Sequence, residues 1–330
     1  MNKAIAILVI MGWHLSTTAQ SYAPPAGQPG STAIHMESSL FTSWAKGITL
    51  ERGYVFIEDT TFISNESNRA SFGDPLNALG PATGNSADVV SLGDSGVAVL
   101  TFDTPIMNGP GFDFAVFENS FSDDYLEFAF VEVSSDGNRF VRFPNHSEVQ
   151  TQIQVHGFGL TDTRRVHNLA GKYRAGHGTP FDLEDLKDSA GIDLNAITHI
   201  KIIDVIGSIG LNATYDSYGN KINEPFSSPY ESGGFDLDGV GVINQLVSIQ
   251  EEQPLEVSIF PNPSNGRIYL HTNTTEPFII NIFSIYGKKL IHQERNMNTI
   301  ILDLDLPNGI YILHYQQKSA LFKSVLILEK

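Results

Sequence analysis

Carboxylates stand inside the most apolar stretches of the sequence. Asp236 and Asp238 alternate with Phe235 and Leu237, so a strand through these residues places both carboxylates on one face. Asp204 interrupts an apolar run of its own. Neighbouring carboxylates on a strand face repel each other unless a cation or an arginine lies between them, and Ca²⁺ binds oxygen ligands of this kind. The sequence therefore predicts a Ca²⁺ site with the ligands Asp113, Glu118, Asp204, Asp236 and Asp238.

These acidic residues have two other interpretations. In the first, each carboxylate accepts hydrogen bonds from backbone amides or pairs with an arginine such as Arg139, Arg142 or Arg174. In the second, two carboxylates form the catalytic pair of a glycoside hydrolase or lyase, which requires a fixed separation across a cleft that a sequence does not give. The candidates for such a pair are Glu118, Asp123, Asp124, Glu127 and Glu132.

The motif Gly93-Asp94-Ser95-Gly96 matches the turn that carries the nucleophile of trypsin-like proteases. That nucleophile needs a histidine and a carboxylate earlier in the chain, and His35 is the only histidine between residue 20 and the motif. The motif is therefore interpreted as a β-turn that leads into a strand. The sequence also contains no HExxH, P-loop or Gly-x-Ser-x-Gly motif, so we expect a protein that is not an enzyme.

The segment between Arg164 and Leu183 collects hydrogen-bond donors and rings in an otherwise acidic chain. A tyrosine in it can stack on a sugar or another planar ring, while neighbouring Lys, Arg and His side chains donate hydrogen bonds. The two histidines are too far apart in sequence for a local zinc motif. In the alternative interpretation, this segment packs across a sandwich and closes its edge. The candidate ligand-binding residues are His167, Lys172, Tyr173, Arg174 and His177.

Apolar runs separated by turn residues predict strands and little helix in the central part of the chain. One short helix is predicted at 182–189. The region before Leu50 is rich in Pro, Gly and Ser and is predicted to be irregular. The predicted strands are 89–90, 97–102, 111–117, 126–133, 200–206 and 239–243.

Charge and composition exclude several classes of partner. The formal net charge is −17, from 37 acidic and 20 basic residues. Nucleic acids and anionic lipids are bound mainly through lysine and arginine, so neither is an expected partner. Because the chain has no cysteine, it forms no disulfide and has no site for lipoprotein acylation.

The N-terminus has the pattern of a secretory signal. A basic start is followed by an apolar segment at 4–15 and by small residues before Gln20, which predicts a signal peptide over residues 1–19. The apolar segment is shorter than the roughly 20 residues that a membrane span needs, and no other apolar run approaches that length. We therefore expect export and no transmembrane segment.

The C-terminal tail contains VSIFPNPSNGRIYL (Val257–Leu270), then IINIFSIYGKKL, LPNGIYILHYQQ and FKSVLILEK. Its apolar runs are separated by turn residues such as those of 261–263 and 307–309, which predicts a small antiparallel β-sandwich. The tail closely resembles the type A sorting domain of the type IX secretion system of Bacteroidota. The resemblance implies that the secretion machinery recognises residues 257–330. It also implies that the protein lies outside the outer membrane, either tethered to the surface or released.

The central part carries VVSLGDSGVAVLTFDTPIMNGPGFDFAVFENSF (Val89–Phe121), FAFVEVSSDG, HNLAGKYRAGHGTPFDL, IKIIDVIGS and SGGFDLDGVGVIN. This series resembles a group of bacterial cell-surface proteins of jelly-roll type. The expected fold is therefore all-β: a jelly-roll-like β-sandwich over residues 20–248, a linker at 249–256 and the small antiparallel sorting sandwich at 257–330. Proteins of this kind can occur near outer-membrane receptors for corrinoids.

The resulting prediction is a secreted ligand-binding protein of the cell surface. A glycan is the favoured ligand, on analogy of fold alone. The first alternative is capture of a corrinoid such as cobalamin for an outer-membrane receptor, with His167 or His177 as contacts. The second is a carbohydrate-active hydrolase or lyase.

Overall fold

The structure, a computed structural model, describes residues 21–246, 256–273, 276–317 and 320–330. The chain divides into two compact units, Met1–Val247 and Ser248–Lys330. The predicted signal peptide lies outside the described residues, as does the predicted linker apart from Glu256. We call the two units the central unit and the tail unit, and each is described by itself.

The first sheet of the central unit has six antiparallel strands. Their order is β1-β11-β6-β13-β2, and β4 also pairs with β13. Strands β6 and β13 lie at its centre and are buried along their whole length. The strands are β1 (Ile34–His35), β2 (Ser43–Trp44), β4 (Val90–Ser91), β6 (Phe114–Glu118), β11 (His177–Phe181) and β13 (Asp236–Val242).

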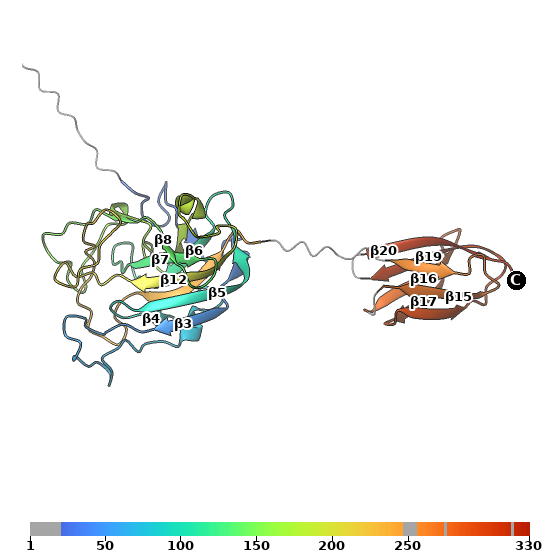
Figure 1. The fold of residues 1–330 in the computed structure, drawn as a ribbon, viewed down its shortest axis with the longest axis horizontal. Helices are drawn as coiled ribbons and strands as arrows, with labels where there is room; N and C mark the ends of the chain where they lie inside the picture. The colour runs from blue at the N-terminus through green and yellow to red at the C-terminus, as the bar shows by residue number, and fades with distance from the viewer. Residues whose placement is uncertain (1–20, 247–255, 274–275, 318–319) are drawn as a thin grey trace, which may run out of the picture. The chain divides into compact units, whose positions relative to one another are not determined.

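The second sheet has five antiparallel strands in the order β3-β5-β12-β7-β8, and Figure 1 shows β5, β12 and β7 side by side. A separate two-stranded pair, β9 (His146–Ser147) and β10 (Val166–His167), lies outside both sheets. The strands of the second sheet are β3 (Gly47–Glu51), β5 (Val97–Ile106), β7 (Ala129–Ser134), β8 (Val141–Arg142) and β12 (Ile197–Asp204). Three single 3₁₀ turns are η1 (Pro75–Ala78), η2 (Thr163–Arg165) and η3 (Leu183–Leu186).

The core of the central unit lies between these two sheets. Leu100 of β5 and Ile202 of β12 belong to the same buried apolar cluster as Val116 of β6 and Leu237 of β13. Because successive side chains of a strand point to opposite faces, β5 and β6 give alternate residues to this cluster, whereas β12 and β13 do so only beyond an irregularity in their pairing. The arrangement is a β-sandwich, which confirms the predicted all-β class.

The opposite face of the first sheet is covered by the N-terminal part of the central unit. Phe117 of β6 packs against Phe41 and Trp44, with ring centroids 5.6 and 5.4 Å apart. Ala82, Ala115 and Phe117 form the small buried cluster on this side. Strands β6 and β13 are therefore covered on both faces, and polar side chains on them need partners inside the protein.

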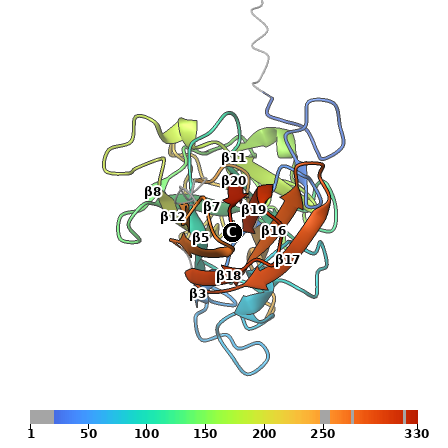
Figure 2. The ribbon, with the colours of Figure 1, turned by 90° about the vertical axis from the view of Figure 1, so that its right-hand side faces the viewer.

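The tail unit is a second, smaller sandwich. A three-stranded sheet in the order β14-β15-β18 and a four-stranded sheet in the order β17-β16-β19-β20 bury a common apolar cluster. Figure 2 shows β19 between β16 and β20, as the strand pairing requires. The strands are β14 (Val257–Phe260), β15 (Arg267–Thr272), β16 (Phe278–Ser284), β17 (Lys289–Arg295), β18 (Thr299–Asp303), β19 (Gly309–Gln317) and β20 (Ala320–Leu328).

Two local predictions are corrected. The helix predicted at 182–189 is only the 3₁₀ turn η3, capped by the Asp182 side chain, which accepts from the amide of Glu184. The region before Leu50 is not wholly irregular, because β1, β2 and β3 pair with β11, β13 and β5. These strands could not be predicted from the Pro- and Gly-rich composition of the region, because they form through pairing with distant strands of the sheets. Among the described residues, no helix has the length and apolar character needed to cross a membrane.

Candidate functional site

The predicted binding segment lies beneath the N-terminal segment of the central unit. The ring of Tyr22 stacks on His167, with centroids 4.9 Å apart and an angle of 8° between the planes. The hydroxyls of Thr32 and Tyr173 share a hydrogen bond of 2.8 Å. Arg174 donates to the carbonyl of Ala26 over 3.2 Å. The side chains of this segment therefore hold the N-terminal segment in place.

Two of the five predicted binding residues are buried. Tyr173 is 1% exposed and Lys172 is 4% exposed. Lys172 Nζ donates to the carbonyl of Val166 over 2.8 Å. The expectation that Tyr173 stacks on a ligand is therefore wrong for this arrangement, because neither face of its ring is open. Of the five residues, Arg174 is partly exposed and lines a cavity, His177 is partly exposed, and His167 is exposed.

Burial lowers the pKa of two side chains in this segment. It lowers the pKa of Lys172 to about 8 from 10.5, against the opposing effect of Asp162. It also lowers the pKa of His167, to which the nearby Lys172 charge contributes. A buried ammonium with a single hydrogen-bond acceptor is costly, so the fold tolerates Lys172 rather than being stabilised by its charge.

Replacing Lys172 tests this cost. Between pH 8 and 10.5 the folded protein has released the Lys172 proton while the unfolded chain still holds it, so stability rises with pH across this window. The shift corresponds to a rise of about 3 kcal/mol. The Lys172→Met variant is expected to lack this rise in urea unfolding measured from pH 7 to pH 10.5. Parallel pH profiles for the two proteins would show that the ammonium is not strained.

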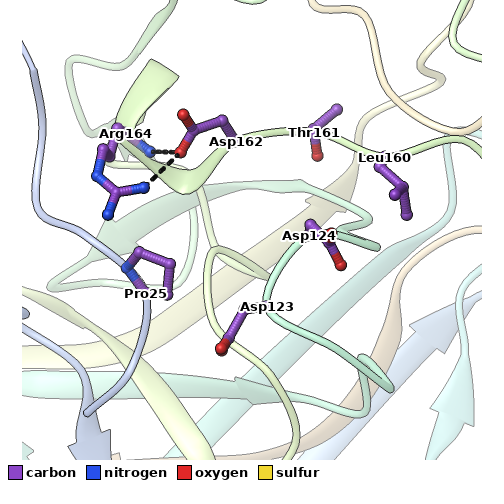
Figure 3. A pocket seen from close by; sticks show the side chains of 7 residues that line it. All are labelled: Pro25, Asp123, Asp124, Leu160, Thr161, Asp162 and Arg164. Carbon is purple, nitrogen blue, oxygen red and sulfur yellow. Dashed lines mark hydrogen bonds and ion pairs between the residues drawn. The ribbon is translucent and has the colours of Figure 1, made fainter. Parts of the chain in front are cut away.

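Two open cavities lie beside Arg174. The larger, of about 660 Å³, is lined by Pro25, Asp123, Asp124, residues 160–162 and Arg164 (Figure 3). The smaller, of about 220 Å³, includes Asn119, Ser120, Phe121, Arg174 and Ala175 in its lining. Arg174 Nη1 donates to Asp123 Oδ1 over 2.5 Å. One partner of this ion pair lines each cavity, so the two are neighbours, and we call them together the binding face.

The binding face combines charged side chains with exposed apolar ones. In the larger cavity Arg164 bonds with its own neighbour Asp162, as Figure 3 shows, through its backbone amide at 2.9 Å and Nη1 at 3.4 Å. Phe121 is 77% exposed and Leu160 is 62% exposed. Carboxylates, a guanidinium and an exposed ring can together hydrogen-bond and stack on a polar, ring-containing molecule.

Phe121 and Arg164 were not predicted from the sequence as binding residues. Asp123 and Asp124 were predicted only as candidates for a hydrolase pair. A phenylalanine inside the polar run 119–124, where no strand periodicity buries it, was the available signal. The remaining elements of the site come from tertiary contacts that bring residues 119–125, 160–164 and 174 together.

The structure separates the five predicted metal ligands. Asp113 accepts hydrogen bonds from the amides of Gly109 and Leu183 at 2.8 and 2.7 Å and from Asn244 at 2.9 Å. Asp238 accepts from the amides of Thr83 and Gly84, both at 2.9 Å. Both carboxylates therefore match the alternative interpretation, in which amides satisfy them.

The other three predicted ligands belong to a larger group of buried carboxylates, named here the carboxylate cluster. Asp204, at the end of β12, accepts from the amides of Ser95 and Phe235 at 2.9 and 2.7 Å. Burial and the charge of Asp236 raise the pKa of Glu118 well above its ordinary range. Burial likewise raises the pKa of Asp204, with a further contribution from Asp94. The six members are all buried, and each either raises the pKa of another member through its charge or has its own pKa raised in that way: Asp94, Glu118, Glu127, Asp204, Glu224 and Asp236.

The Gly93-Asp94-Ser95-Gly96 motif supplies one carboxylate of the cluster and a backbone amide that binds another. It forms the predicted turn before β5, because the amide of Gly96 donates to the carbonyl of Gly93 at 2.8 Å. The Asp94 side chain accepts from the amide of Ile57 at 2.8 Å, and burial raises its pKa to about 7. The Ser95 amide holds Asp204. In this motif the aspartate and the backbone, rather than the serine hydroxyl, make the contacts.

The predicted five-residue Ca²⁺ site is not formed as such. In the described part of the chain, no three His, Asp or Glu side chains are grouped closely enough to hold a metal ion. The reason is that Asp113 lies among the amides before β6 and Asp238 faces residues 83–84, away from the other carboxylates. Strand alternation put Asp236 and Asp238 on one face, but each found separate donors there.

Comparisons with known proteins concern mainly the tail. No curated protein matches the chain significantly. A solved structure described as "Biofilm associated protein - BSP domain" is 9% identical with a TM-score of 0.24, covering 71% of this chain and 48% of that one. Ruminococcus gnavus β-glucuronidase in complex with uronic isofagomine is 8% identical with a TM-score of 0.17, covering 72% and 35%. The chain spans less than half of these structures, and scores this low carry no argument.

The tail gives a definite assignment. Residues 258–329 match the model of the secretion system C-terminal sorting domain. The match covers the tail unit from β14 to the end of β20. The chain therefore ends in a type IX secretion sorting domain, which directs the protein to the cell surface.

Proposed function

We propose that the protein is a cell-surface binding protein that takes a glycan on its binding face. The sorting domain supports the location, and the binding face supports the ligand class. The observation that carries the proposal is the exposed ring of Phe121 in the lining of the smaller cavity, which the Arg174–Asp123 ion pair connects to the larger one. We also propose that the protein binds this ligand without converting it.

The chemistry of the binding face favours a neutral, hydroxyl-rich ligand. Asp123, Asp124 and Asp162 accept hydrogen bonds, while Arg164 and Arg174 donate them. Strongly anionic ligands meet three carboxylates there, and strongly apolar ligands leave those carboxylates desolvated. A sugar offers both hydroxyl donors and acceptors, together with an apolar ring face that can pack on Phe121.

Binding measurements on a polysaccharide panel test the proposal. Calorimetry with the full-length secreted protein is expected to show saturable binding to at least one neutral polysaccharide. The products are then analysed for chain cleavage, which we expect to be absent. Cyanocobalamin belongs in the same panel: a spectral change and saturable heat with it, and none with any glycan, would replace this proposal with corrinoid capture.

Phe121→Ala is the sharpest variant for this site. Removing the stacked ring is expected to weaken glycan binding about tenfold, a loss of about 1.4 kcal/mol. The control is Tyr218→Ala, which removes a ring that is similarly exposed and lines neither cavity. Equal affinities of the Phe121→Ala variant and the wild type would exclude the binding face as the glycan site.

A further inference from the structure

The four-stranded sheet of the tail unit carries apolar side chains on both of its faces. One face packs on the buried cluster of the tail unit through residues such as Ile280, Leu313 and Leu326. When one face of an antiparallel sheet covers a core, the other face is ordinarily polar. Here the outer face includes five apolar residues that are not part of the core cluster: Phe283, Ile310, Ile312, Val325 and Ile327.

Strand pairing places these five side chains next to one another. Phe283 of β16 lies opposite Ile312 of β19, and Ile312 lies opposite Val325 of β20. In the next row of the same face, Ile310 lies opposite Ile327. Cross-strand partners on one face are in side-chain contact, so the five residues form one continuous patch, which we call the apolar patch. Ile310 and Val325 are each 54% exposed, so the patch reaches the surface.

Two lysines border the apolar patch. Lys289 Nζ lies 6.0 Å from the centre of the Phe283 ring. Lys323 lies opposite His314, whose ring packs on Phe283 with centroids 4.8 Å apart. Neither lysine forms an ion pair with a described residue, whereas several acidic side chains of the tail unit pair with other basic groups. The two ammonium groups are therefore free to meet carboxylates of a partner.

The charge of the tail differs in sign from that of the whole chain. Residues 257–330 contain seven basic and five acidic residues, whereas the whole chain contains 20 and 37. A partner that recognises a basic, apolar surface is therefore directed to the tail, because long-range attraction between opposite charges orients two proteins before they dock.

The free edge of β20 is less accessible than the outer face beside the apolar patch. The Asn262 side chain accepts from the amide of Ile327 over 2.9 Å and donates to the carbonyl of Val325 over 2.7 Å. The amide of Ser264 donates to the carbonyl of Ile327 over 2.9 Å. A partner strand at this edge would have to displace residues 262–264. Docking of side chains on the outer face leaves these hydrogen bonds intact.

We propose that the apolar patch, with Lys289 and Lys323, is the surface through which the secretion machinery binds the tail. We call this surface the sorting face. The sorting-domain match requires a partner that recognises the tail, and the sorting face offers that partner both apolar area and unpaired charge. The complementary surface belongs to a protein that presents apolar side chains bordered by carboxylates. This inference rests on the assignment of the tail and is independent of the ligand of the binding face.

The test uses two substitutions in the full-length protein, produced in cells that have a type IX secretion system. Val325→Glu places a carboxylate in the apolar patch, and Lys323→Glu reverses a charge at its border. We expect each variant to lower surface delivery at least about fivefold, because a like charge facing the partner's carboxylates opposes docking. Lys323→Arg keeps the charge and should be delivered as the wild type is. Antibody labelling of intact cells, relative to the protein in lysates, measures delivery.

Ile301→Glu is the matched control. Ile301 lies on the edge strand β18 of the other sheet of the tail unit and is 56% exposed, close to the 54% of Val325. Its neighbours on the same face are the polar residues Thr299 and Asp303, and Asp303 already pairs with Arg267. This variant should reach the surface at the wild-type level. Unchanged melting temperatures of the purified variants would show that the substitutions leave the fold intact.

Three results would overturn the inference. The first is wild-type delivery of both Val325→Glu and Lys323→Glu in cells that fail to deliver the protein without residues 257–330, which contradicts the sorting face but not the assignment of the tail. The second is an equal loss of delivery in Ile301→Glu, because the effect is then not specific to one face. The third is a wild-type dimer, seen by light scattering, that Val325→Glu dissociates without a change in delivery, since the patch then joins two copies of the chain.

Discussion

Deleting residues 257–330 is expected to abolish delivery of the protein to the cell surface. The deleted segment contains the whole match to the sorting domain. The apolar clusters of the central unit contain no residue from the tail unit, whose own cluster begins at Ile268. The truncated protein should therefore fold and remain inside the cell envelope. Antibody labelling of intact cells, compared with the protein in lysates, measures the effect.

A fusion provides the complementary measurement. Residues 257–330 placed behind a signal peptide and a reporter protein are expected to bring the reporter to the surface, because the tail unit has its own core and both of its sheets. Surface labelling of cells that carry the reporter without the tail supplies the background. Surface display of the truncated protein at the wild-type level would contradict the assignment of the tail.

Gly171→Ala is expected to be the most destabilising single substitution near the site. Gly171 has φ +80°, and a Cβ atom there would lie 1.8 Å from the carbonyl oxygen of Glu127. Its neighbour Ala170 exchanges both backbone hydrogen bonds with Ala129 at the start of β7. The added methyl group must therefore push the segment away from β7. We expect a loss of at least about 4 kcal/mol, measured by urea unfolding.

Gly219→Ala separates backbone strain from steric overlap. Gly219 has nearly the same φ, +82°, but a Cβ atom there would meet nothing within 4 Å. This variant should lose only the cost of a left-handed conformation, about 1 kcal/mol. Equal losses in the two variants would show that the contact with the Glu127 carbonyl is easily relieved. In that case the segment 167–177 is not packed firmly against β7.

Much of the all-β fold was available from periodicity. The predicted strand 97–102 lies within β5, and 200–206 overlaps β12, because alternating or continuous apolar runs between turn residues fix a strand whatever it pairs with. Boundaries were less accurate. The strand predicted at 239–243 begins three residues earlier, where Asp236 is buried against Ser91 and Asn119. A polar residue at a strand end gives no sign of its burial until its partners are known.

The sequence predicted a donor-rich binding segment, but it did not predict which of its side chains are covered. The donor-rich segment 167–177 was recognised, and Arg174 does border the binding face. Tyr173 is covered by the segment that contains Thr32, about 140 residues away, whose hydroxyl shares a hydrogen bond with the Tyr173 hydroxyl. Composition does not predict a contact between residues so far apart in the sequence. Phe121 was not predicted as a binding residue, because a single exposed aromatic residue produces no periodic pattern in the sequence.

By itself, the sequence determined the secretion tail, the strand-forming runs and the presence of carboxylates within them. These are local properties, set by side-chain alternation, turn residues and the order of short motifs along the chain. Only the tertiary structure decided which carboxylates are buried near enough to one another to raise each other's pKa. Asp94, Glu127 and Glu224 belong to the carboxylate cluster although they were not predicted as metal ligands. Asp113 and Asp238 were predicted as ligands, but each accepts hydrogen bonds from nearby backbone amides instead. The physical reason is that strand period fixes the face on which a residue lies, whereas sheet pairing fixes its neighbours.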